Sequence, residues 1–165
     1  MFLDNYCCIS NEKVTFTRAQ ASTFAKQIAD DFNPLHDIDA KRFCVPGDLL
    51  FAMILNKAGL HQDMTFTFSG MVTEDSVLNF PSTIDGKANV SDDNGKEYMS
   101  VEAEGEKTNS SSVIESLIRS YVEFSGHTFP DMLIKLMEEK GVMINPARPM
   151  IMYESMSIHL DSVEL

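Results

Sequence analysis

The chain has 165 residues, 44% of them hydrophobic, which suffices for one domain, or one and a half, with a buried core. Its formal net charge of −12 argues against binding to nucleic acids or anionic membrane surfaces, which need basic patches. Three cysteines, two of them adjacent at Cys7 and Cys8, form neither a disulfide framework nor a metal-binding pattern, and we expect no metal and no cofactor. The N-terminus lacks a signal pattern, and no stretch reaches the roughly 18 apolar residues of a membrane span, so we expect a cytoplasmic protein.

The first part of the chain predicts a strand, a helix and an irregular loop. Residues 14–16 are typical of a short strand. Thr17 followed by Gln20 matches a helix capping box, and apolar residues at helical spacing continue over residues 18–29. Pro34 disfavours the α conformation for the residue before it, so the helix should end before an irregular segment.

A second helix should be buried on all sides. Residues 49–55 form an unbroken apolar run, and a helix that is apolar all round belongs in a core. Gly47, after Pro46, opens this helix, and Gly59 is a natural C-terminal cap.

Four strands are predicted next, over residues 64–69, 76–80, 86–91 and 96–103. The sequence Asp93-Asn94-Gly95 is typical of a tight turn that joins the last two as a hairpin. Because the strands follow the helices instead of alternating with them, the pattern favours an α+β class, with an antiparallel sheet around the buried helix. We assign residues 1–107 to this domain.

The rest of the chain, residues 108–165, is assigned to a second segment. A polar, serine-rich stretch over residues 104–112 predicts a linker. After it we predict two helices, a stiff connector and a strand, over residues 113–122, 130–141, 145–149 and 150–160. The stretch from Phe129 to Gly141 parallels the stretch from Val45 to Gly59, which indicates a faint internal repeat. Two alternatives stay open. Either a second repeat begins here, cut short or completed by a partner chain, or the segment is a helical appendage with one added strand.

The best chemical site lies in the loop between the two helices. Asp30 and Asp31 fall at a helix C-terminus, where the helix dipole disfavours negative charge. His36 follows a few residues later, and histidine is the side chain that changes charge near neutral pH. A carboxylate in a poor electrostatic position beside a histidine is typical of a general acid–base pair. The alternative is a solvated Asp31, with a His36 that only caps the next short helix.

The sequence Asp31-Phe32-Asn33-Pro34-Leu35-His36 resembles the D-x-N-P-h-H signature of the MaoC-like (R)-specific enoyl-CoA hydratases, which have the hot-dog fold. The resemblance covers about residues 14–60 and, more weakly, extends to about residue 107. It implies a hot-dog domain, with an antiparallel sheet wrapped around a central helix, that pairs as a homodimer. It also implies a hydratase or dehydratase (a lyase) acting on an enoyl or 3-hydroxyacyl thioester of coenzyme A or acyl carrier protein.

In that resemblance Asp31 and His36 are the catalytic pair that adds one water across the double bond. The N–H group near Gly47 polarises the thioester carbonyl. Asn33 and Gly47 are therefore expected at the substrate. Lys41 and Arg42 form the basic cluster near the motif that could offset the charge of coenzyme A, and their alternative role is the solvated face of a short helix.

Several positions depart from the signature of that family. Asp30 stands where the family has glycine, Pro46 stands where it has histidine, and Leu55 stands where it has serine. These departures favour an alternative function, a non-catalytic hot-dog module that binds an acyl thioester or a protein partner. A third alternative is a structural protein with a vestigial site. The residues leave open whether the chain is an enzyme.

His127 is a second candidate residue. With Phe129 and Pro130 it is similar to the His-x-Phe-Pro stretch of hot-dog dehydratases acting on acyl carrier protein. The sequence names no acidic partner for it. His61 and His159 show no constellation and are expected to be ordinary surface or strand residues.

Overall fold

The computed structural model describes residues 2–145 and 152–164. Its helical segments are η1 (Phe2–Asn5), α1 (Arg18–Gln27), η2 (Pro34–His36), α2 (Gly47–Ala58), α3 (Ser111–Gly126), η3 (Phe129–Leu133, a π-helix) and α4 (Ile134–Lys140). Its strands are β1 (Cys8–Ser10), β2 (Lys13–Thr15), β3 (Leu60–Phe68), β4 (Leu78–Asn79), β5 (Lys87–Ser91), β6 (Glu97–Thr108) and β7 (Ser155–His159).

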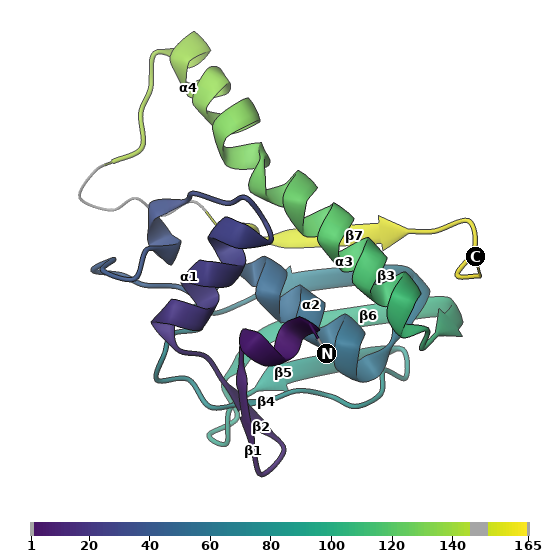
Figure 1. Cartoon of the computed structure of the whole chain (residues 1–165). Coiled ribbons are helices and arrows are strands. Elements are labelled where there is room, and N and C mark those ends of the chain that lie inside the picture. The colour runs from purple at the N-terminus through teal and green to yellow at the C-terminus, as the bar shows by residue number, and fades with distance from the viewer. Residues whose placement is uncertain (1, 146–151, 165) are drawn as a thin grey trace.

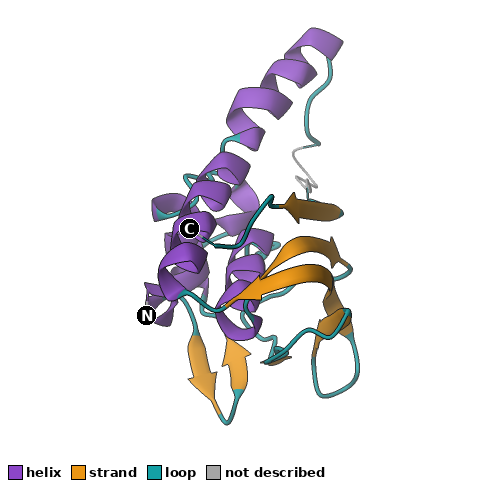
Figure 2. Cartoon of the chain, turned by 90° about the vertical axis from the view of Figure 1, so that its right-hand side faces the viewer, coloured by secondary structure: helices purple, strands orange, loops and turns teal. Residues whose placement is uncertain are grey.

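The strands form one seven-stranded sheet in the order β1-β2-β4-β5-β6-β3-β7, and every neighbouring pair is antiparallel. The helices lie to one side of this sheet (Figure 2). Helix α2 packs against α1, α3 and β3, and stands at the centre of the molecule (Figure 1). The predicted α+β class, with an antiparallel sheet, is therefore confirmed.

Burial of α2 explains its central place. Residues 49–55 are each at most 2% exposed, as the unbroken apolar run predicted. Phe51 packs edge-on against Phe66 of β3, with 5.1 Å between ring centroids, and lies 4.9 Å from the ring of Tyr121 on α3. Each such large side chain contributes about 1.5–3 kcal/mol on burial, so α2 is the main hydrophobic anchor of both the sheet and α3.

The start of α1 follows the predicted capping box. The Gln20 N–H donates to Thr17 Oγ1 over 3.1 Å, and the Thr17 N–H donates to Gln20 Oε1 over 3.0 Å. The helix ends at Gln27, earlier than predicted, although the Ile28 N–H still donates to the Phe24 carbonyl oxygen.

The linker predicted over residues 104–112 is wrong in its first half. Strand β6 continues to Thr108, where it pairs with Leu60 at the start of β3. Because the backbone ladder to β3 supplies the hydrogen bonds, these exposed residues need no apolar side chains to form a strand.

The division at residue 107 stays a prediction. In the described residues, α3 packs against α2, and β7 pairs with β3 in the same sheet. Strand β7 covers only Ser155–His159 of the predicted strand over 150–160, whose residues 150 and 151 lie outside the described residues, as does most of the predicted connector.

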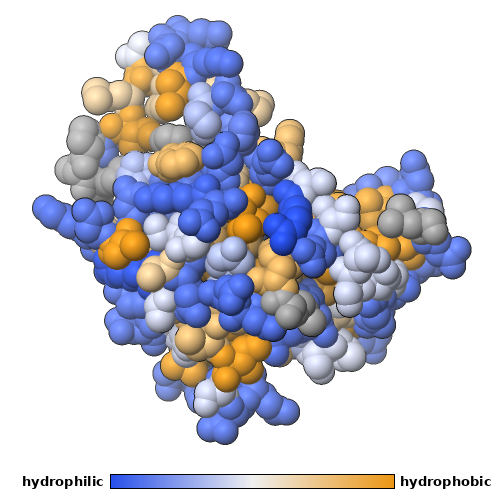
Figure 3. Space-filling view, in the orientation of Figure 1, coloured by the Kyte–Doolittle hydropathy of each residue, from blue (hydrophilic) through white to orange (hydrophobic). Residues whose placement is uncertain are grey.

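The end of α3, η3 and α4 project from the body as an arm (Figure 1). The arm and the residues directly after it expose large apolar side chains: Phe124, Met132, Leu136, Val142 and Met143. Hydrophobic colour is visible near the top of Figure 3, which has the orientation of Figure 1. Among the helices in residues 2–145 and 152–164, none combines the length and apolarity that crossing a membrane requires.

Candidate functional site

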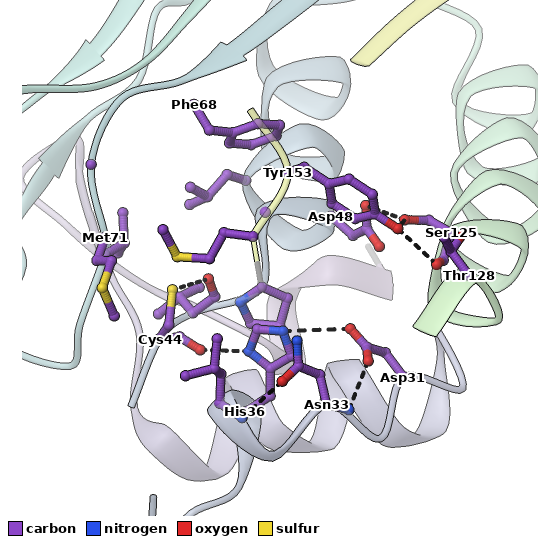
Figure 4. Close-up of a pocket in the computed structure, with 18 of the residues that line it drawn as sticks. Asp31, Asn33, His36, Cys44, Asp48, Phe68, Met71, Ser125, Thr128 and Tyr153 are labelled. Atoms are coloured by element: carbon purple, nitrogen blue, oxygen red, sulfur yellow. Dashed lines mark hydrogen bonds and ion pairs between the residues drawn. The ribbon is translucent and has the colours of Figure 1, made fainter. Parts of the chain in front are cut away.

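A cavity of about 570 Å³ opens between the loop that follows α1, the start of α2, the loop after β3 and the end of α3 (Figure 4). Its walls are mostly apolar, with Leu50, Phe68 and Val72 among them. The polar residues that concern its chemistry are Asp31, Asn33, His36, Asp48, Ser125 and Tyr153. Ligand pockets in proteins typically have such a size and such a lining.

The loop between α1 and η2 is held by its own side chains. Asp31 Oδ1 accepts the Asn33 N–H over 2.9 Å, and Asn33 Oδ1 accepts the Leu35 N–H over 3.1 Å, which caps η2. Pro34 occupies the first turn of η2, where its missing N–H costs nothing. The second oxygen of the carboxylate, Asp31 Oδ2, lies 3.4 Å from His36 Nε2.

The other nitrogen of His36 fixes its tautomer. His36 Nδ1 lies 2.7 Å from the carbonyl oxygen of Cys44, in a buried setting. A carbonyl can only accept, so Nδ1 carries the proton and a neutral His36 presents an unprotonated Nε2 to Asp31. Two acceptors then face each other. A water that donates one hydrogen to each, or a proton on Nε2, satisfies both.

The backbone beside this pair is unusual. Asp30 adopts a positive φ of 51°, a conformation that asparagine and aspartate tolerate better than most residues. Gly126, at the end of α3, packs against the same turn, and a Cβ on it would lie 1.9 Å from the Ala29 carbonyl oxygen. Only a glycine lets α3 approach this closely.

His127 has acidic partners that the sequence did not name. Its Nε2 lies 2.7 Å from Asp30 Oδ2, and its Nδ1 lies 3.2 Å from Asp131 Oδ2. The hydrogen bond with Asp30, and then that with Asp131, raises the pKa of His127. His127 does not line the cavity, whereas its neighbours Ser125 and Thr128 do. Its contacts tie the arm to the loop that carries Asp31.

Asp48 is a functional candidate that sequence reasoning missed. It lies in the first turn of α2 and is only 4% exposed. Burial raises the pKa of this carboxyl to about 7, with a smaller contribution from the negative charge of Asp31, while the hydrogen bond from Ser125 opposes the rise. An acidic residue directly after a helix-opening glycine, at the head of a fully apolar helix, was the available signal.

Cys44 also lines the cavity, but burial raises the pKa of its thiol to about 11. The thiol therefore stays protonated at neutral pH and is a poor nucleophile. Within residues 2–145 and 152–164, no three histidine, cysteine or acidic side chains are grouped in a way that could hold a metal ion.

Four of the predicted site residues line this one cavity: Asp31, His36, Asn33 and Gly47. Lys41 and Arg42 lie in an exposed loop segment and do not line it, so their role in binding substrate stays a prediction. Among the described residues that line the cavity, none is a lysine or an arginine.

A family model described as "Protein of unknown function (DUF3581)" matches residues 1–165. The chain belongs to the DUF3581 family. Neither a curated protein nor a solved structure is significantly similar to it. The assignment to the MaoC-like hydratase family is therefore wrong. Its physical weakness is that the six-residue motif encodes a local device, an Asn cap and a proline before a short helix, which different families can build.

Gly126→Ala tests the close approach of α3. Helix propensity alone predicts that this change raises the free energy of unfolding by about 1 kcal/mol, but the clash with the Ala29 carbonyl should outweigh that gain. We expect a net loss of about 1–3 kcal/mol in the free energy of unfolding, measured by urea denaturation. Ser120→Ala, at an exposed position of the same helix, is the control and should change it by less than about 0.5 kcal/mol. A Gly126→Ala protein as stable as the wild type would contradict this packing.

Asp48→Asn tests the buried acid. A carboxyl titrating at about 7 when folded and near 3.9 when unfolded binds its proton more tightly in the folded state. Its contribution to stability is thus fully present below pH 4 and is lost as the pH rises through 7, by up to about 4 kcal/mol. The Asp48→Asn variant should lack this decline in urea titrations between pH 4 and 8.

Asp93→Asn is the control, because the contribution of Asp93 to the free energy of unfolding changes with pH in the opposite direction. Hydrogen bonds from Asn79 and Lys13 lower the pKa of Asp93, so its contribution is lost as the pH falls. Parallel pH curves for the wild type and the Asp48→Asn variant would show that Asp48 is not a buried acid.

Proposed function

We propose that the protein is a hydratase or dehydratase that acts on an enoyl or 3-hydroxyacyl thioester. The observation that carries the proposal is the pairing of Asp31 Oδ2 with His36 Nε2, 3.4 Å apart, at the wall of the cavity. Because His36 Nδ1 donates to the Cys44 carbonyl oxygen, the lone pair of Nε2 is directed toward the carboxylate. A water bound between the two would donate to both and keep its oxygen lone pairs for a ligand.

Hydration follows from this arrangement. The water oxygen forms a bond to the β-carbon of the enoyl group as one of its protons passes to the Asp31–His36 pair. The α-carbon then takes a proton from the same pair, so one water is added in all and the pair returns to its starting state. Dehydration is the reverse sequence.

The charge that develops on the thioester oxygen needs a donor. Gly47 lies in the first turn of α2 and lines the cavity. First-turn N–H groups have no acceptor within their helix and lie at its positive end, so they suit a developing oxyanion. The apolar walls formed by Leu50, Phe68 and Val72 suit the acyl chain.

We further propose that the sheet and α2 form a hot-dog arrangement. Support comes from the burial of residues 49–55 and from a single antiparallel sheet that lies along α2. The homodimer predicted from the sequence stays a prediction, which analytical ultracentrifugation would test.

A second candidate function is binding without turnover. At 3.4 Å, a protonated His36 can pair directly with Asp31, and the pair then holds no free base. In this state the cavity would bind an acyl thioester but would not activate water.

Enoyl-CoA hydration assays over a range of chain lengths, starting with crotonyl-CoA, test the first function. Asp31→Asn and His36→Ala should each lower kcat/KM by about 10²–10⁴-fold, because each removes half of the acid–base pair. Loss of the conjugated enoyl absorbance measures the rate.

The matched controls come from a second Asp–His pair. Asp63 and His159 pair on neighbouring strands β3 and β7, and neither lines the cavity. Asp63→Asn and His159→Ala should retain the wild-type rate. Absence of turnover at every chain length would reject the hydratase, and tight thioester binding in the same samples would establish the second candidate.

A further inference from the structure

A second polar group lines the same cavity as the Asp31–His36 pair. Ser125 Oγ donates to Asp48 Oδ1 over 3.1 Å. The Tyr153 hydroxyl donates to the Ser125 carbonyl oxygen over 3.0 Å, and its oxygen lies 3.2 Å from Ser125 Oγ. Figure 4 shows these side chains gathered beside α2, apart from His36. Nothing in the chemistry of the Asp31–His36 pair uses this group.

The setting of Asp48 favours its neutral form. The side chain is almost fully buried, and no lysine or arginine is among the described residues that line the cavity. Without a cation, a buried carboxylate loses its solvation and gains little in return, so the acid holds its proton. The nearby Asp31 adds repulsion, and together these effects raise the pKa of Asp48 to about 7.

One oxygen of Asp48 is left for a ligand. Oδ1 accepts the Ser125 hydroxyl, and among the described residues none forms a hydrogen bond with Oδ2. Asp48 lines the cavity directly after Gly47. A neutral acid whose Oδ1 is occupied carries its O–H on Oδ2. Apolar active sites of other enzymes use a protonated carboxyl in this way, as a hydrogen-bond donor to a carbonyl oxygen.

Resting on the function proposed for the cavity, we propose that Asp48 donates a hydrogen bond from Oδ2 to the carbonyl oxygen of the ligand, and that it selects uncharged carbonyl compounds over free carboxylates. The carbonyl oxygen has two lone pairs, so it can accept from Asp48 and from a first-turn N–H of α2 together. A carboxylate ligand would bring a negative charge next to Asp31 and into apolar walls, with no lysine or arginine in the described lining to offset it.

The test uses S-butyryl-N-acetylcysteamine labelled with ¹³C at the carbonyl. This thioester has no double bond to hydrate and no phosphate groups, so binding is measured apart from turnover. Isotope-edited infrared spectroscopy reports the hydrogen bond, because a donor lowers the carbonyl stretching frequency. In the wild type, the bound carbonyl should absorb below its frequency in an apolar solvent.

Two substitutions at Asp48 separate the donor from a packing role. Asp48→Asn keeps an oxygen for Ser125 and an N–H for the ligand, so the frequency shift should remain and Kd should stay within about threefold. Asp48→Ala removes one of the two donors, so the shift should shrink to the part that the first-turn N–H of α2 causes, and Kd should rise at least about tenfold. If circular dichroism shows that the Asp48→Ala variant does not fold, the Asp48→Leu variant takes its place. Ser120→Ala is the control.

Four results would overturn the proposal: a wild-type carbonyl without the shift, an Ala or Leu variant with the full wild-type shift, butyrate that binds as tightly as the thioester, or a wild type that does not bind the probe. If the carbonyl frequency of the butyryl thioester shifts but the crotonyl thioester is not hydrated, the hydratase is rejected and the role of Asp48 still holds. If the crotonyl thioester is hydrated but the carbonyl frequency does not shift, the role of Asp48 is rejected and the hydratase still holds.

Discussion

The chemistry proposed for the cavity depends on one hydrogen bond, from His36 Nδ1 to the carbonyl oxygen of Cys44. Without it the imidazole could rotate or exchange tautomers, and Nε2 would have no fixed protonation state opposite Asp31. The bond joins two segments that flank an exposed loop, and the Cys44 N–H donates in return to the Leu35 carbonyl over 3.0 Å. These two contacts close the loop and hold the imidazole against the cavity wall.

The two sides of the cavity are built by different means. The Asp31–His36 side is local, because Asp31, Asn33 and His36 all lie within six consecutive residues. The Asp48 side is assembled from distant parts of the chain, since Ser125 comes from the end of α3 and Tyr153 from the segment before β7. Gly126, next to Ser125, allows the end of α3 to approach the turn that precedes Asp31.

This difference explains what the sequence could predict. The Asp31–His36 pair, the capping of α1 and the burial of α2 follow from spacing and local turn chemistry, and the structure brings these residues together as expected. The Asp48–Ser125 and Asp30–His127 contacts join residues far apart in the chain, so no local pattern encodes them. The polar end of β6 was missed because its pairing with β3, and not its own residues, makes it a strand.

The family result shows the limit of a short motif. A six-residue signature pointed to a loop whose residues line a cavity, but the chain as a whole belongs to the DUF3581 family. The geometry of the site must therefore support any function by itself. The features on which the proposed function rests are a fixed imidazole, a facing carboxylate and a buried acid at the head of α2.

The tautomer of His36 tests this account most directly. Nitrogen-15 NMR of histidine-labelled protein, with the His36 signals assigned by their loss in His36→Ala, separates a protonated ring nitrogen from an unprotonated one. The account predicts that neutral His36 carries its proton on Nδ1, with Nε2 free and able to accept. A neutral His36 with its proton on Nε2 would contradict it, because the lone pair would then face Cys44 instead of the cavity.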